Sequence, residues 1–221
     1  MTSAQITVRG SHSVTFAPEQ ATVHAALSGE GRSAEPVFRK VAEALTAVTA
    51  SIEALHHPRR GPVTRYAIDQ VRTGSHRPWN EEGKRLPLVH TAAVSVTALF
   101  TDFDALARWV AWSSGVEGLS IGYISWALTD AKRLAVERRT RQKAVRDAKR
   151  RAQDYADALD LGSVRVHSIS DPGLGGGPQQ KLFLTGARAA SAAEPAQFEL
   201  RPDEITIAAE VEATFVVGSR R

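Results

Sequence analysis

A strictly alternating stretch near the end of the chain, ITIAAEVEATFVV at residues 205–217, constrains the fold most strongly. Apolar side chains occupy every second position, and Thr and Glu fill most of the positions between them. Neighbouring side chains of a β-strand point to opposite faces, so this pattern predicts a strand with one buried and one solvent-facing side. Such a strand indicates an antiparallel sheet that is covered on one face.

The start of the chain shows the same alternation twice. Residues 6–16 and residues 21–27 each place apolar side chains on one side, and the turn APEQ at 17–20 separates the two runs. Two alternating runs around a short Pro-containing turn predict a β-hairpin. Further strands are expected at residues 63–72, at 89–100, from 119 onward and at 164–166.

Two shorter segments have the periodicity of amphipathic helices. From 37 to 55, apolar residues recur at three- and four-residue steps, Ser33 is the expected N-cap, and Pro36 lies in the first turn, where its missing N–H has no cost. The sequence TDFD at 101–104 predicts the cap of a second, short helix.

A long helix of about 30 residues, ~45 Å in length, is expected to begin at Thr129 or Asp130. Gly162 is the expected C′ residue, at which the backbone takes the left-handed conformation that ends a helix. A narrow stripe of mostly small apolar residues is predicted to press this helix against the sheet. The stripe consists of Ala131, Leu134, Ala135, Val145, Ala148, Ala152, Ala156 and Leu159.

These elements follow the order β-β-α-β-β-α-β-α-β-β. Hairpins mixed with helices indicate an α+β fold, with a mostly antiparallel sheet and helices packed on one face. A chain of 221 residues is long enough for a substantial core, and we expect a single domain over 1–221. A long segment rich in Gly, Ala and Pro, residues 171–204, precedes the last strand and is predicted to be a partly mobile loop.

The positive charge of the chain is concentrated in one place. Between Asp130 and Arg151 the sequence has ten Lys and Arg residues against three acidic residues, a local charge of +7. The whole chain carries +4, so the remainder carries −3. Basicity is therefore a local feature of the long helix.

This basic helix has two interpretations. Its Arg and Lys side chains could neutralise the phosphates of a polyanion such as nucleic acid. Alternatively, a helix with one small apolar stripe must be polar elsewhere, and its cations simply face solvent. We favour the second interpretation. The candidate polyanion contacts are Arg138, Arg139, Arg141, Lys143, Arg146, Lys149, Arg150 and Arg151.

No catalytic or metal-binding motif is recognisable in the sequence. The chain has no Cys, and its seven His residues form no H-E-x-x-H pattern. The run GLGGGP at 173–178 lacks the spacing of a phosphate-binding loop. We therefore predict no catalytic residue, no metal and no cofactor. An unrecognised enzyme site would use His90 or the loops at 74–87 and 171–204.

Four segments together resemble the SIMPL domain family, which includes periplasmic immunogenic protein-like members and kinase-associated SIMPL proteins. The segments are ITVRGSHSVTFAPEQATVHAALSGEG (6–31), VFRKVAEALTAVTASIEAL (37–55), LAVERRTRQKAVRDAKRRAQDYADALDLG (134–162) and ITIAAEVEATFVV (205–217). The first is similar to the opening hairpin of the family, and the third to its long helix, where Ala recurs before a Leu-Gly stop. Relatives usually have a Tyr near the position of His90.

The resemblance implies a fold and a tendency to self-associate, because at least one relative forms large ring-like assemblies, but it implies no reaction. Our expectation is a non-enzymatic assembly or interaction protein that forms a homo-oligomer and has a possible protein partner. A polyanion-binding module is the first alternative and an enzyme the second. The sequence shows no export signal and no apolar run long enough to cross a bilayer, so we expect a cytoplasmic protein.

Overall fold

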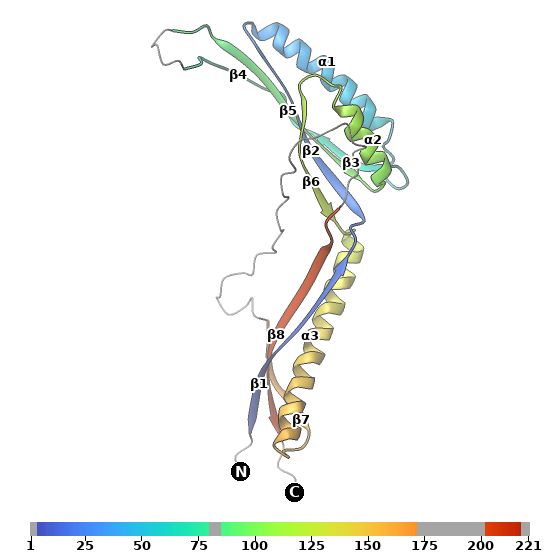
Figure 1. Ribbon diagram of the computed structural model, residues 1–221, viewed down its shortest axis with the longest axis vertical. Coiled ribbons are helices and arrows are strands. Elements are labelled where there is room, and N and C mark those ends of the chain that lie inside the picture. The colour runs from blue at the N-terminus through green and yellow to red at the C-terminus, as the bar shows by residue number, and fades with distance from the viewer. Residues whose placement is uncertain (1–3, 80–84, 172–201, 218–221) are drawn as a thin grey trace, which may run out of the picture. The chain divides into compact units, whose positions relative to one another are not determined.

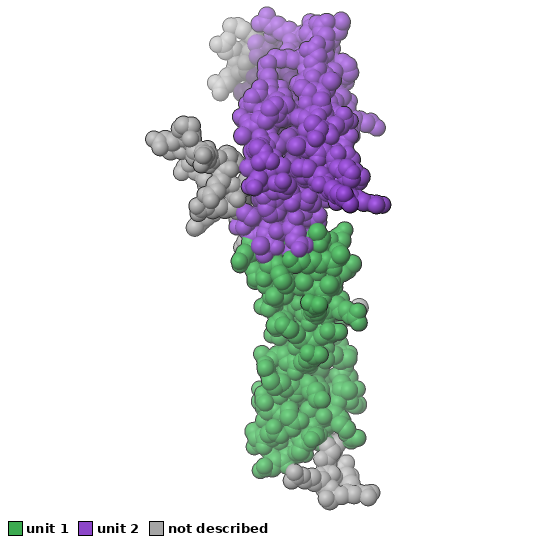
Figure 2. Space-filling view, turned by 90° about the vertical axis from the view of Figure 1, so that its right-hand side faces the viewer, with its two compact units in different colours: residues 1–16, 129–194, 204–221 green, residues 17–128, 195–203 purple. Residues whose placement is uncertain are grey.

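The computed structural model describes residues 4–79, 85–171 and 202–217, and the chain forms two compact units (Figures 1 and 2). Unit 1 takes in residues 1–16, 129–194 and 204–221, and unit 2 takes in residues 17–128 and 195–203. The single domain over 1–221 stays a prediction. Residues 172–201, most of the predicted loop 171–204 and all of the GLGGGP run, lie outside the described residues.

Unit 1 is a three-stranded antiparallel sheet with one long helix along it (Figure 1). The sheet has the order β1-β8-β7, and the helix α3 contacts all three strands. The elements are β1 (Gln5–Phe16), α3 (Asp130–Ala158), β7 (Val164–Ser170) and β8 (Ile205–Val217). Alternation explains the sheet, because the apolar side of β8 is buried against α3 while its Thr and Glu side remains open.

The buried side of α3 is a row in which every fourth residue faces the sheet. Its members are Val136, Thr140, Ala144, Ala148, Ala152 and Ala156. A row of this spacing is inclined to the helix axis, so it follows the twist of the strands beneath it. The predicted stripe was therefore correct at its three C-terminal alanines and wrong at the other positions. Ala131, Leu134, Ala135, Val145 and Leu159 are exposed.

Gly10 in β1 marks the closest approach of sheet and helix. A Cβ atom at Gly10 would lie 2.2 Å from Ala144 O and 2.7 Å from Ala148 Cβ. Only a residue without a side chain fits there, and only small residues fit opposite it. The stripe is rich in Ala because the helix must lie this close to the strand.

Unit 2 is a five-stranded antiparallel sheet with two helices on one face (Figure 1). The strand order is β3-β5-β2-β6, and β4 also pairs with β5. The elements are β2 (Gln20–Gly31), α1 (Ala34–Glu53), β3 (Val63–Ile68), β4 (Arg72–His76), β5 (Val89–Phe100), α2 (Phe103–Ser113) and β6 (Leu119–Ala127).

The core of unit 2 lies between its sheet and both helices. Phe100 of β5 and Leu106 of α2 are fully buried, and Ile52 brings α1 into the same cluster. Trp109 of α2 donates from Nε1 to Ser51 Oγ of α1 at 3.1 Å, which joins the two helices. Asp102 caps α2 as predicted, since its carboxylate accepts from Ala105 N at 2.9 Å.

The predicted α+β class with mostly antiparallel strands is confirmed, but the pairing of the strands differs from the prediction. The hairpin of β1 with β2 was wrong: β1 pairs with β8, whereas β2 pairs with β5 and β6. The described residues therefore form two sheets instead of one. β4 was missed, because its five residues are all exposed and have no apolar alternation.

The end of α3 also differs in detail from the prediction. The helix ends at Ala158 with Leu159 as the C-cap, so Asp160, with φ 53°, is the C′ residue in the left-handed conformation. Gly162 is left-handed as well, with φ 84°, but it lies beyond the helix end. The same backbone reversal therefore takes place two residues earlier than predicted.

Substitution of Gly10 by Ala tests the close packing of β1 on α3. The added methyl group has no space, so we expect the free energy of unfolding to fall by about 2 kcal/mol. Gly115→Ala is the matched control, because the nearest atom to its new Cβ, Trp112 O, is 3.5 Å away. Urea denaturation of both variants measures the difference, and equal stabilities would contradict the packing described.

Candidate functional site

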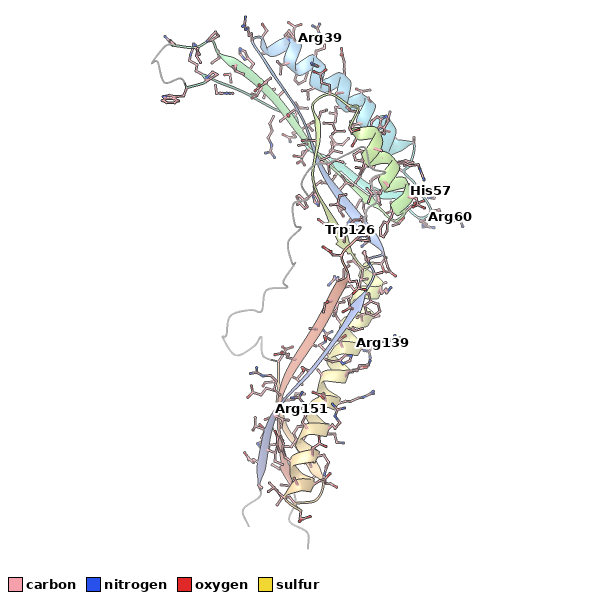
Figure 3. All side chains as sticks on the ribbon, viewed as in Figure 1. Arg39, His57, Arg60, Trp126, Arg139 and Arg151 are labelled. Atoms are coloured by element: carbon pink, nitrogen blue, oxygen red, sulfur yellow. The ribbon has the colours of Figure 1, made fainter. Side chains whose placement is uncertain are left out.

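All eight predicted polyanion contacts lie on α3, and all eight are exposed. Figure 3 labels two of them, Arg139 and Arg151, on the helix of unit 1. The buried row from Val136 to Ala156 packs one side of the helix on the sheet. The cations therefore occupy the outer side of the helix and its two flanks. The structure thus places all eight predicted residues along one helix.

Ion pairs divide these eight residues into two sets. Arg150 and Arg151 both bind the carboxylate of Asp147, and Arg151 Nε lies 3.0 Å from Asp147 Oδ2. Across residues 4–79, 85–171 and 202–217, the other six have no carboxylate within ion-pair distance. We call these six the cationic face: Arg138, Arg139, Arg141, Lys143, Arg146 and Lys149.

The helical repeat places the cationic face around three sides of α3. At about 100° per residue, Arg138 and Arg146 lie opposite the buried row, on the outermost line of the helix. Arg139 and Lys143 fall on one flank, and Arg141 lies on the other. Charges spread in this way can surround part of a ligand instead of contacting a single point.

Asp147 is the residue of this helix whose contacts sequence reasoning missed. Its side chain is only 12% exposed, and its Oδ2 accepts a hydrogen bond from Ser11 N in β1 at 3.1 Å. This backbone hydrogen bond, supported by the charges of Arg151 and Arg150, lowers the pKa of Asp147. The three- and four-residue spacing to two arginines was a signal for these ion pairs.

The two outer strands of the unit 1 sheet each receive a hydrogen-bonding side chain from α3, but they differ in exposure. On the β1 side, Asp147 of α3 satisfies an N–H group of the edge. On the β7 side, six of seven residues are exposed, including Val166 at 65% and Ile169 at 52%. We call β7 with these two side chains the open edge. Sequence analysis predicted only a short strand here.

Unit 2 contains a groove of about 710 Å³ at the start of α1. Its floor is apolar and includes Val37 and Val41, and its rim carries Arg32 and an ion pair between Lys40 and Glu117. Glu30 also lines the groove, so its two cations and two carboxylates sum to no net charge.

The remaining sequence candidates are dispersed. His12 lies half-buried on β1 and His90 half-buried on β5, in different units. The predicted loop 74–87 begins as part of β4, and its residues 80–84 lie outside the described part. Among the described residues, no group of three or more His, Cys, Asp or Glu side chains is placed to hold a metal.

The two tryptophans of α2 differ in burial, as expected when one of them packs in the core. Trp109 is 4% exposed, whereas Trp112 is 42% exposed beside it, with ring centroids 6.2 Å apart.

Within residues 4–79, 85–171 and 202–217, no helix combines the length and apolar character needed to cross a bilayer.

Replacement of Asp147 by Asn tests the anchor between α3 and β1. The folded-state pKa is lowered, so the carboxylate stabilises the protein above its unfolded pKa of about 3.9, and this stabilisation is lost as the pH falls through the folded value. We expect Asp147→Asn to be destabilised at neutral pH and the difference from wild type to shrink below about pH 4. Denaturant titrations at several pH values measure it.

Asp154→Asn is the control, because Asp154 is an exposed carboxylate of the same helix. We expect this change to leave stability nearly unaltered at neutral pH. A difference for Asp147→Asn that stays constant from neutral to acidic pH would show that its charge has no part in the anchor.

Comparison with known proteins identifies the family of the chain. A family model described as SIMPL, a protein of unknown function (DUF541), matches residues 6–215. No curated protein matches the chain. The match runs from the first strand of unit 1 through all of unit 2 to the last strand of unit 1, so it covers both units. The chain therefore belongs to the SIMPL family.

Proposed function

We propose that this protein acts by association rather than by catalysis, and that it assembles with a second copy of itself through the open edge of unit 1. The observation that supports this proposal is β7, which lies at the edge of its sheet among the described strands and whose residues are exposed from Arg165 to Ser170. Unpaired edge strands readily add a further strand, since their backbone N–H and C=O groups lack partners on one side.

Protection of the edge is weak on β7. Native edge strands are commonly guarded by charges, Pro or a covering element. The sequence of β7, VRVHSIS, contains one Arg, Arg165, and no Lys, Asp, Glu or Pro. Helix α3 contacts both outer strands: Asp147 Oδ2 accepts from Ser11 N of β1, and Gln153 Oε1 accepts from Val164 N of β7 at 3.1 Å. Beyond Val164, the residues of β7 from Arg165 to Ser170 remain exposed, and this part of the strand is the one we assign to a partner.

A second copy fits this edge by symmetry and by side-chain chemistry. Val166 pairs with Phe215 and Ile169 pairs with Ala213, so both point to the α3 side of the sheet. In an antiparallel β7–β7 pair around a two-fold axis, Val166 of each copy can lie opposite Ile169 of the other. Such pairing buries both exposed apolar side chains and joins two three-stranded sheets into one of six strands.

Light scattering behind a sizing column tests the assembly. We expect the wild-type protein to self-associate at tens of micromolar. The double variant Val166→Lys/Ile169→Lys should be monomeric, because it places like charges opposite each other in the pair. The matched control, Phe38→Lys/Tyr123→Lys, changes two side chains of unit 2 that are 48% and 61% exposed, and it should associate like wild type.

Circular dichroism verifies that each variant is folded. A wild-type protein that remains monomeric at these concentrations would contradict the proposal. Self-association that persists unchanged in Val166→Lys/Ile169→Lys would place the interface elsewhere. The absence of catalysis and the cytoplasmic compartment stay predictions.

A further inference from the structure

We propose that the cationic face of α3 binds the phosphate backbone of double-stranded nucleic acid without reading its sequence. This activity is separate from the association proposed above, because it uses the outer side and flanks of α3 and not the edge of β7. The argument depends on the local charge, on the distribution of acidic groups around it and on the shape of the helix.

The charged residues of the segment 138–151 are almost all positive. It contains eight cations and one acidic residue, Asp147, so its net charge is +7. Asp147 is directed toward β1, where it binds Ser11 N, and it is largely shielded from solvent. The carboxylate therefore anchors the helix and does not neutralise the six residues of the cationic face.

The acidic groups near this surface are paired, lie on the opposite face of the sheet, or lie beyond the cationic face. Asp154, an exposed carboxylate of α3, follows Lys149 by five residues. Glu137, which immediately precedes the cationic face, is bound by Arg133 at 2.9 Å. Glu210 and Glu212 of β8 alternate with the buried Val211 and therefore lie on the sheet face opposite α3. The field above the outer side of α3 is consequently positive, which attracts polyanions and accelerates their association.

The helix holds its charges at a spacing that suits a duplex. From Arg138 to Lys149 the axial rise is ~16 Å at 1.5 Å per residue. Duplex DNA presents about one negative charge per 1.7 Å, so roughly ten phosphates lie along the same length. The buried row keeps α3 fixed on the sheet, so binding a duplex costs side-chain entropy but requires no refolding of the backbone.

A duplex explains this surface better than a lipid bilayer. Interfacial helices insert an apolar side that is flanked by cations. In the segment 138–151 the one exposed large apolar side chain is Val145, at 38% exposure. Cations on the outer line and on both flanks instead match a curved ligand with phosphates on more than one side.

Fluorescence anisotropy of a labelled DNA duplex of random sequence, titrated with the full chain, tests the proposal. If all six residues of the cationic face contact phosphates, affinity should fall about 10³-fold between roughly 50 and 200 mM salt. A second duplex of unrelated sequence should bind with the same affinity, because phosphate contacts carry no sequence information.

The variant Arg138→Gln/Arg139→Gln/Arg146→Gln removes three charges and keeps good helix formers. We expect weaker binding and a salt dependence, log K against log salt, that is shallower by about three. The matched control, Arg39→Gln/Arg59→Gln/Arg60→Gln, removes three exposed charges from unit 2, where Figure 3 labels Arg39 and Arg60. It should bind like wild type.

Any one of the following outcomes overturns the proposal. No binding of either duplex at low salt excludes it directly. Equal losses in the two triple variants would show a general effect of net charge instead of a site on α3. Vesicles that contain phosphatidylserine provide the last arm: binding to these vesicles without binding to the duplex would assign the cationic face to membranes.

Discussion

The close contact of β1 with α3 is the constraint on which the architecture of unit 1 depends. Gly10 leaves no space for a side chain, and Ala144 and Ala148 are completely buried against the sheet. A helix that lies this close can turn only small residues toward the strands. Its long side chains must therefore point to the outer side and the flanks, and in this sequence most of those between Arg138 and Arg151 are Arg and Lys.

Size, more than hydrophobicity, determined which residues of α3 face the sheet, and this explains the error in the predicted stripe. Leu134 and Leu159 are among the most apolar residues of the segment, yet both are exposed, whereas Thr140 is buried. A count of apolar positions favours the leucines, because it takes no account of the distance between sheet and helix. That distance is set by Gly10, about 130 residues earlier in the chain. The apolar periodicity of the helix sequence carries no information about this distance.

Alternation predicted most strands of the sheets but not their partners. β1 and β2 have the same apolar alternation and are separated by a short turn, so local rules favour a hairpin. Their actual partners, β8 and β5, are distant in sequence, and pattern alone does not select among strands with equally apolar sides. The cations of the candidate site were predictable by position, whereas their division into paired and unpaired residues depends on Asp147 and its bond to β1.

The two proposed activities of unit 1 are compatible, and their geometry connects them. An antiparallel pair of identical strands has its two-fold axis perpendicular to the sheet, so each copy keeps the same side of the sheet. Pairing through β7 would therefore place both α3 helices on one side of the joined sheet. A duplex that contacts one cationic face would then have the second within reach, and the two contacts would strengthen each other through a high effective concentration. Self-association would in this way raise the affinity for nucleic acid, although it adds no residue to the cationic face.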